Sequence, residues 1–341
     1  MKNNYRAWEI HCDDFFRQAT DRDRLKFLVR FAVLAPSSHN SQPWRFEVGE
    51  NEIVVKPDMQ RALPVSDVNH RQLYISIGCA IENIVVAADY YGFHMNVHYA
   101  GLPEGTEVRI LCGSADNAPI KDLRHSIFSI PQRATNRAPY RSNQISTSFC
   151  QRVCEYADAE TEVHLISDSG RKEKIADVVV SALVAAMDDA AFRRELSGYL
   201  MPGITRSMIG MPGTGFGMPL PVSFVAPAFV RFVNVNRLNR KKDKDLLVGH
   251  TPVFAVIATQ GDAPGDWIRA GRVYQRIALE ATREGIATHP MAAAIQIGEY
   301  YRDLQRLVPT ALRPQLFFRM GYTDREAIAS PRIPADMTIY S

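Results

Sequence analysis

The sequence predicts an α+β protein in which two successive halves each combine helices with a few strands. Three observations carry this prediction. Apolar residues recur at helical spacing in several long stretches, and short runs of β-branched and aromatic residues lie between them. The order of these stretches in residues 1–125 is similar to their order in residues 126–341. A chain of 341 residues is also long enough for two domains.

The first half begins with a helix expected over residues 24–35, because Leu25, Leu28 and Ala32 share one helical face. Pro36 follows and disfavours a helical conformation in the residue before it. The other expected elements are a β-hairpin of 44–48 and 52–57, a helix over 73–91 that stops at Gly92, and strands at 94–100 and 107–112.

A polar stretch, residues 114–141, leads into the second half. Its expected elements are helices over 145–156, 171–188 and 267–284 and strands at 162–166, 253–259 and 315–320. The residues between 188 and 253 read as irregular, and the charged run 237–245 within them reads as a solvated loop. The helix–glycine pairs at 73–92 and 267–285 hint at an internal duplication, although a chance match explains them equally well.

Residues 201–221 contain four Met, five Gly and four Pro, a composition that disfavours both helix and strand. Loops of this length are usually lids or disordered insertions. The apolar Met and Phe side chains favour a lid that packs on the protein, and a loosely attached insertion is the alternative.

Composition excludes several classes of protein. With 46% hydrophobic and 23% charged residues the chain is not a disordered one, and a net charge of +3 without a localised basic and aromatic patch predicts no nucleic-acid partner. No apolar run approaches the roughly 20 residues of a membrane-spanning helix, and no early apolar segment resembles a secretory signal. Five scattered cysteines suggest a reducing compartment. We therefore expect a cytoplasmic protein without a metal site or a membrane partner.

The segment that joins the first helix to the first strand holds the most concentrated chemistry. Within six residues after Pro36 the chain holds hydroxyl groups (Ser37, Ser38), an imidazole (His39) and amides (Asn40, Gln42) in one short turn. Such a turn is suited to binding the edge of a flat heteroaromatic ring and a polyol chain. A polar turn capped by a buried Trp is the alternative.

This segment resembles the flavin-contacting turn of the nitroreductase family, in which an A-P-S-x-x-N-x-Q-P-W pattern follows a helix. Four further stretches resemble motifs of the tandem, Acg-like branch of that family and occur in the same order. They are residues 63–93, the R-x-[ST]-x-R motif at 133–137, the helix–Gly–Pro stretch at 267–291, and the G-Y and Arg elements at 320–332. Together the matches span residues 24–335.

The resemblance implies a nitroreductase-like fold duplicated in tandem, in which the two halves mimic the family's homodimer and hold FMN between them. It implies domains at 1–125 and 126–341, a monomeric pseudo-dimer or a loose homodimer, and one FMN per chain. By matching motifs, the cofactor-binding residues are Pro36, Ser37, Ser38, Asn40, Gln42, Arg71, Arg133, Thr135, Asn136, Arg137, His289, Pro290, Met291 and Arg332. The arginines Arg133, Arg137 and Arg332 are expected at the phosphate, because guanidinium groups bind phosphate oxygens in a fixed fork.

The implied function is transfer of hydride from NAD(P)H, through FMN, to a nitroaromatic or quinone-type acceptor. The flavin carries the chemistry, so no side chain is assigned a catalytic role. Two alternatives stay open at this point. One is a non-catalytic FMN-binding or storage protein whose flavin is covered by residues 201–221. The other is an interaction module without a cofactor.

Overall fold

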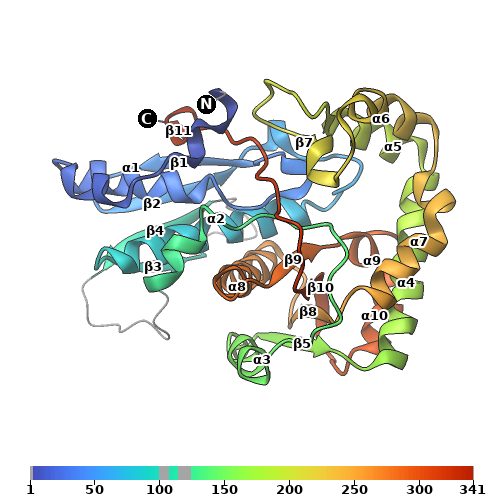
Figure 1. The fold of residues 1–341 in the computed structure, drawn as a ribbon. Helices are drawn as coiled ribbons and strands as arrows, with labels where there is room; N and C mark the ends of the chain where they lie inside the picture. Colours follow the sequence, from blue (N-terminus) through green and yellow to red (C-terminus); the bar gives the residue numbers. More distant parts are fainter. Residues whose placement is uncertain (1–2, 100–106, 114–123, 341) are drawn as a thin grey trace.

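The structure is a computed structural model that describes residues 3–99, 107–113 and 124–340. Its centre is a pair of long helices, α2 (Arg71–Tyr90) and α8 (Pro264–Arg283), which pack against each other. Helix α2 also packs on one β-sheet and α8 on a second, so the two helices lie between the sheets (Figure 1). Mixed helices and sheets in both parts agree with the predicted α+β class.

The first sheet contains the hairpin that the sequence predicts. It has the order β11-β1-β2-β4-β3, with β11 parallel to β1 and the remaining neighbours antiparallel. Its strands are β1 (Trp44–Val48), β2 (Glu52–Pro57), β3 (His94–His98), β4 (Val108–Gly113) and β11 (Ile339–Tyr340). The last of these comes from the C-terminus, which runs from the second sheet back to the first (Figure 1). The predicted boundary stretch begins at residues 114–123, which lie outside the described residues.

The second sheet is antiparallel and has the order β5-β8-β10-β9. Its strands are β5 (Thr161–Ile166), β8 (Val253–Thr259), β9 (Ala287–Pro290) and β10 (Arg313–Gly321). Every residue of β8 is buried. Helix α8 covers one face of this sheet, and α4 (Ser169–Asp188) covers the other together with α9 (Ala293–Gln296) and α10 (Tyr300–Leu307), which pack on it. The predicted strands of this half are confirmed, and β9 is an addition that the sequence did not indicate.

The two central helices cross at glycines that occupy equivalent places. Both helices have 20 residues, and Gly78 and Gly271 are each the eighth. A Cβ built on Gly78 would lie 2.2 Å from the carbonyl oxygen of Ile268, and one on Gly271 would lie 2.1 Å from that of Ile75. The contacts are reciprocal, since each carbonyl belongs to the residue three before the opposite glycine. The backbones can approach this closely only where both side chains are absent.

Both helices also end in the same way. Gly92 and Gly285 follow them with φ values of 79° and 70°, a region that L-residues rarely adopt. The next residue in each case donates its N–H to a carbonyl five positions back, Phe93 to Ala88 and Ile286 to Ala281, as in a Schellman motif. The predicted stop at Gly92 is confirmed.

A buried ion-pair cluster joins the central helices. The Glu82 carboxylate, on α2, accepts from Arg272 Nε at 2.8 Å and from Arg276 Nε at 2.6 Å, both on α8. Burial acts to raise the pKa of Glu82, but Arg276 and Arg272 outweigh it and hold the pKa below its usual value. The carboxylate is therefore charged at neutral pH and ties the two halves of the chain together.

Replacing Glu82 by Gln is expected to lower the free energy of unfolding by about 3 kcal/mol, because it removes the buried carboxylate that two partly buried guanidinium groups share. Since the pKa is lowered in the folded state, this stabilisation is present above the usual pKa of 4.5 and is lost as the pH falls below it. Urea unfolding at pH 7 and pH 3.5 measures both. The matched control is Glu52→Gln, whose exposed pair with Arg109 is worth less than about 1 kcal/mol. Equal losses in the two variants would contradict the assignment.

Residues 189–252, expected to be irregular, are largely helical, and this is the main correction. They form α5 (Ala190–Tyr199), α6 (Leu220–Phe232) and α7 (Val235–Gly249). The Asn234 side chain accepts from Arg237 N and so begins α7, which makes the charged run 237–245 a helix and not the expected loop. Of the four prolines that suggested a break, Pro219 is the N-cap of α6 and Pro221 stands in its first turn, where a missing N–H costs nothing, while Pro227 lies inside the helix.

The rest of the described chain surrounds this core. Its helices are α1 (Asp21–Ala32), α3 (Thr147–Cys154), α9 (Ala293–Gln296) and α10 (Tyr300–Leu307), and its short parallel strands are β6 (Leu200–Met201) and β7 (Met211–Pro212). Helices α1 and α3 are confirmed within a few residues. Among the described helices, α2 alone is long and apolar enough to cross a membrane, and 83% of the window that passes this test is buried inside the protein.

Candidate functional site

A cavity of about 590 Å³ opens between the two halves of the chain. The turn after α1 and the face of α2 line it from the first half, and the segment before α3, α8 and the end of β9 line it from the second. A volume in this range suits a ligand of cofactor size. Eleven of the predicted residues line this cavity: Pro36, Ser37, Ser38, Asn40, Arg133, Thr135, Arg137, His289, Pro290, Met291 and Arg332.

The turn at the cavity wall is strained and tightly braced. His39, Asn40 and Gln42 have φ values of 52°, 56° and 54°, which are uncommon for residues with a side chain. The Ser37 hydroxyl accepts from Gln42 N at 3.0 Å, and the Gln42 side chain accepts from Ile333 N at 2.8 Å. Backbone strain that the surroundings hold in place is typical of binding sites.

Asn40 connects this turn to two distant segments. Its side-chain amide donates to the carbonyls of Gly210 and Pro331, both at 2.9 Å, and its oxygen accepts from Arg332 Nη1 at 2.5 Å. Arg332 also donates to the carbonyl of Ala35 at 3.2 Å. The side chain of Asn40 is thereby fully engaged within the protein, and it positions a guanidinium group at the cavity.

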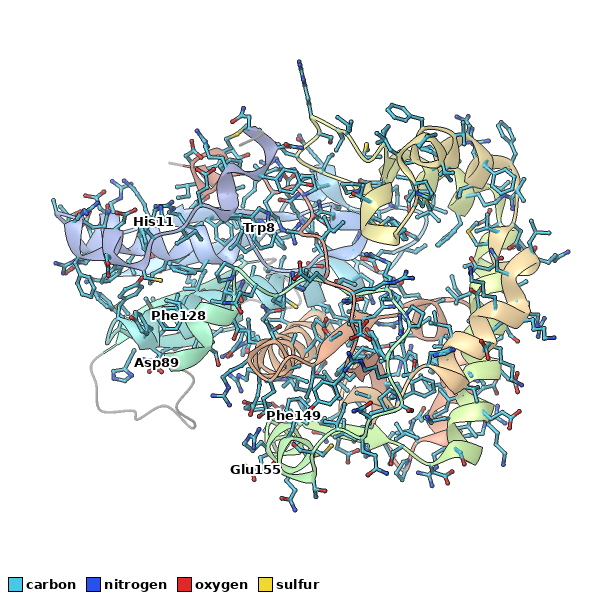
Figure 2. The ribbon with its side chains drawn as sticks, viewed as in Figure 1. Trp8, His11, Asp89, Phe128, Phe149 and Glu155 are labelled. Carbon is cyan, nitrogen blue, oxygen red and sulfur yellow. The ribbon has the colours of Figure 1, made fainter. Side chains whose placement is uncertain are left out.

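The guanidinium group of Arg332 is buried, and its hydrogen-bond acceptors among the described residues are neutral oxygens rather than carboxylates. Its guanidinium carbon lies 5.2 Å from the ring centroid of Trp8, whose indole donates to Ser330 O at 2.9 Å. Figure 2 shows Trp8 beside the C-terminal segment that carries Ser330 and Arg332. Burial, and then repulsion from Arg133, lower the pKa of Arg332 to about 9. The group remains charged at neutral pH, and its Nε has no hydrogen-bond partner.

Arg133 is the clearest indication of an anion-binding site. It is buried, and among the described residues neither its Nε nor its Nη1 has a hydrogen-bond partner. Its Nη2 donates to the carbonyl of Leu34 at 3.5 Å. Burial lowers its pKa, and within the described parts of the chain no carboxylate forms an ion pair with it. An unpaired buried guanidinium is costly, so a bound anion is the arrangement that would satisfy it.

Arg137 adds a third cation to the same wall. Its guanidinium carbon lies 4.3 Å from the ring centroid of Phe216, and burial lowers its pKa to about 10. The segment is held by a parallel bridge between Thr135 and Thr288. Among the described residues that line the cavity, the one carboxylate is Asp243, whose pKa burial raises. The cavity therefore carries an excess of positive charge.

The two histidines of the cavity are neutral at physiological pH. Burial lowers the pKa of His39 to about 4 and holds that of His289 well below its usual value. Arg319 Nε donates to His289 Nδ1 at 3.2 Å, so the neutral ring of His289 carries its proton on Nε2. A neutral His39 has no imidazolium proton to donate in this pH range.

A change of His39 to Gln is expected to reduce the loss of stability on acidification. The pKa of His39 is lower in the folded protein than the usual 6.5, so the unfolded chain binds more protons between about pH 6.5 and 4 and stability falls across that window. The variant should show a smaller difference in Tm between pH 7.5 and pH 5. The control is His98→Gln, at the one exposed position of β3, and an identical pH dependence in all three proteins would contradict the prediction.

Three predicted residues lie outside the cavity wall. The Arg71 guanidinium donates to Ile295 O at 3.1 Å and pairs with Asp262 at 3.3 Å, so its charge is already matched. The Asn136 side chain donates to Arg325 O at 2.7 Å and shapes its own segment. Gln42, predicted to bind the cofactor, braces the strained turn by accepting from Ile333 N.

The glycine-rich segment packs on this turn. Gln42 Nε2 donates to the carbonyl of Met208 at 2.7 Å, and Gly210 N donates to the carbonyl of Asn40 at 3.3 Å. Met211, Phe216 and Met218 from the same segment line the cavity. Residues 201–218 therefore pack on the turn and line part of the cavity, and the lid role of residues 201–221 stays a prediction.

Sequence reasoning missed the apolar arm of the cavity. This arm is lined by side chains of α4, α5, α6 and α7, namely Leu183, Ala186, Met187, Phe192, Leu196, Val230, Val235, Leu246 and Leu247. The helical spacing of Phe192 and Leu196 was the available signal, but the region read as irregular. No group of three or more His, Cys, Asp or Glu in the described ranges is placed to hold a metal ion.

No family model matches the chain. The acg protein of Mycobacterium tuberculosis, provisionally named an NAD(P)H nitroreductase, is 23% identical over 330 residues and covers 92% of this chain and 94% of its own length. A second protein of that organism with the same provisional description is 25% identical over 318 residues, covering 92% and 89%. The chain is similar to these proteins along almost its whole length. The resemblance that the motifs indicate is thus confirmed.

Further matches agree in name. PigM of Serratia sp., described as a probable NAD(P)H nitroreductase, is 23% identical over 339 residues and covers 94% of this chain and 92% of its own. Among solved structures, the FMN-dependent nitroreductase NfnB of Mycobacterium smegmatis, in complex with NADPH, is 15% identical, with a TM-score of 0.43. It covers 64% of this chain and 99% of its own. NfnB from sphigopyxis sp. strain HMH, an FMN and NADPH-dependent nitroreductase, gives a TM-score of 0.42 at 14% identity and covers 63% of this chain and 98% of its own.

Proposed function

We propose that the cavity binds FMN and that the protein is an FMN-dependent oxidoreductase of the nitroreductase type. The observation that carries the proposal is that two nitrogens of buried Arg133 at the cavity wall, Nε and Nη1, have no hydrogen-bond partner among the described residues. A phosphate monoester is close to a dianion at neutral pH and accepts several charge-assisted hydrogen bonds. The relatives named as NAD(P)H nitroreductases support the same class of ligand and of electron donor.

The residues present fit the cofactor. Arg133 and Arg332 would hold the phosphate, with the hydroxyl of Thr135 and the charge of Arg137 on the same wall. Ser37 and Ser38 would meet the ribityl chain and the ring edge. Asn40 and Gln42 act through hydrogen bonds that fix the turn, and the proposal leaves Arg71 out of the contacts because Asp262 already pairs with it.

When bound, FMN supplies the hydride chemistry, accepting a hydride from NAD(P)H and passing it to an aromatic acceptor of the nitroaromatic or quinone type. The protein provides the surroundings. Its apolar arm excludes water from the site, and the three arginines provide the positive charge that an anionic cofactor requires. Neutral His289 keeps an Nε2–H donor on the cavity wall, since Arg319 occupies its other nitrogen.

We infer that the two halves derive from a tandem duplication. The equal lengths of α2 and α8, their reciprocal glycine contacts and their matching glycine stops support this origin. The halves have diverged at the site. The strained polar turn follows the first helix of the first half, and the arginine motif precedes the first helix of the second. One composite FMN site per chain follows from this arrangement.

An absorption spectrum of the purified protein, incubated with FMN and freed of unbound flavin, tests the proposal. We expect flavin bands that bleach when NADH or NADPH is added without oxygen and that return with a quinone. Absence of retained flavin would contradict the cofactor assignment. Retained bands that resist NAD(P)H yet bleach with dithionite would contradict the reductase and leave only flavin binding.

A further inference from the structure

Helix α6 exposes an apolar face at the outer edge of the molecule, next to α5 (Figure 1). The side chains of Phe224, Val225, Phe229 and Phe232 are 57%, 62%, 52% and 75% exposed. Around the helix these four positions, together with Pro221 and Ala228, form one continuous outward surface. Apolar surface of this extent on an exposed helix is typical of an interaction site.

The opposite face of the same helix is also apolar. Ala226 and Val230 are buried, and Val230 lines the cavity. A surface helix normally pairs one apolar face with a polar one, and a helix that is apolar all round is covered on both sides. In α6 the protein covers only the inner side. The helix has no acidic residue, and Arg231 is its one charged residue.

The surroundings of α6 are strongly basic. From the start of α5 to the end of α7, residues 190–249 contain nine Arg or Lys and three acidic residues, although the whole chain has a net charge of only +3. Two of the three acidic side chains are engaged within the protein: Glu195 accepts from Val65 N and Ser66 N at 2.9 and 2.8 Å, and Asp243 accepts from Asn236 Nδ2 at 3.0 Å. Arg194, Arg231, Lys241 and Lys242 are exposed. Positive charge beside an exposed apolar helix is the pattern of segments that bind anionic lipid surfaces.

We propose that this protein docks on the surface of an anionic lipid bilayer through α6, with the aromatic side chains in the interface and the basic residues at the headgroups. The sequence alone led us to expect no membrane partner, because that expectation concerned spanning segments and read this region as a loop. A second copy of the chain is the weaker candidate, since an isologous contact would bring two such basic regions together. Docking does not depend on bound flavin.

Vesicle sedimentation tests the proposal with the full-length protein. We expect the protein to sediment with vesicles that contain phosphatidylglycerol and to stay in solution with pure phosphatidylcholine, and added salt should weaken binding. The double variant F224S/F229S should reduce the bound fraction at least about tenfold, because each aromatic side chain contributes buried apolar area. The variant R231E/K241E should also reduce the fraction bound to the anionic vesicles, because it replaces two basic side chains by acidic ones.

The matched control is F16S/F128S, which removes two exposed phenylalanines far from α6 in the sequence and should bind like the wild type. Thermal unfolding and flavin content, measured in parallel, confirm that each variant is folded and separate this proposal from the cofactor assignment. Three results would overturn the proposal. The wild-type protein does not bind anionic vesicles, or the F224S/F229S variant binds them as strongly as the wild type. The third is that light scattering shows a wild-type dimer that the F224S/F229S substitutions dissociate.

Discussion

Replacement of Arg133 by Ala is expected to weaken FMN binding by at least about 100-fold and, at the same time, to stabilise the flavin-free protein. The two effects share one cause. Arg133 is buried, its Nε and Nη1 have no hydrogen-bond partner among the described residues, and its Nη2 makes one long hydrogen bond, 3.5 Å, to Leu34 O. Two charge-assisted hydrogen bonds to a phosphate are worth about 3 kcal/mol together, which is about 100-fold in affinity. In the flavin-free protein the same buried charge lowers the free energy of unfolding, and replacement by Ala removes this cost.

Fluorescence titration with FMN and thermal unfolding of the stripped protein measure the two effects separately. The control is Arg6→Ala, which breaks an exposed pair with Asp336 and should change neither quantity by much. Arg332→Ala is less informative alone, because Arg332 also bonds Asn40 and Ala35 O and its loss disturbs the turn. The double variant R133A/R332A should retain no flavin. Unchanged affinity in R133A would remove the basis of the phosphate site.

Most of the regular elements could be predicted from the sequence because their own residues specify them. Strand β8 is a run of apolar residues that ends in Thr259, and α2 repeats apolar residues at helical spacing up to Gly92. Such local patterns do not depend on distant partners. Among the elements that were missed, β9 and β11 are short strands that are defined by pairing with β10 and β1. Pairing of this kind has no local signature.

Helices α5, α6 and α7 show a different limit. Proline and glycine near residues 212–221 dominated the prediction, and the caps at Asp189 and Asn234 were not weighed against them. Both side chains accept a backbone N–H and begin a helix. Local chemistry did contain the signal here, so the error lay in its weighting.

The polar end of the cavity could be predicted and the apolar end could not. Ser37, Arg133 and Arg332 stand in motifs whose residue types suit a phosphate and a polyol. Whether an arginine faces a carboxylate is settled only in three dimensions, which is why Arg71 and Arg133 looked alike in sequence. Asp262 pairs with Arg71, and no described carboxylate pairs with Arg133.

The crossing of α2 and α8 sets the distance between the halves, and Gly271→Ala is expected to destabilise the protein by about 3 kcal/mol or more. The new Cβ would lie 2.1 Å from the backbone oxygen of Ile75, and a backbone atom cannot turn aside as a side chain can. Moving the helices apart would also disturb a cavity to which Cys79 and Tyr274, on those helices, contribute. Flavin retention should therefore fall together with stability.

Gly198→Ala is the matched control, since nothing lies within 4 Å of a Cβ at that position in α5. There the same change should raise the free energy of unfolding by about 0.5–1 kcal/mol, because Ala restricts the unfolded chain and favours helix. The reciprocal variant, Gly78→Ala, makes the test stricter. Its Cβ would lie 2.2 Å from Ile268 O, so a two-fold crossing requires losses of similar size at Gly78 and Gly271. Urea unfolding measures all three, and a large loss at only one of the two crossing positions would contradict the symmetric contact on which the composite site depends.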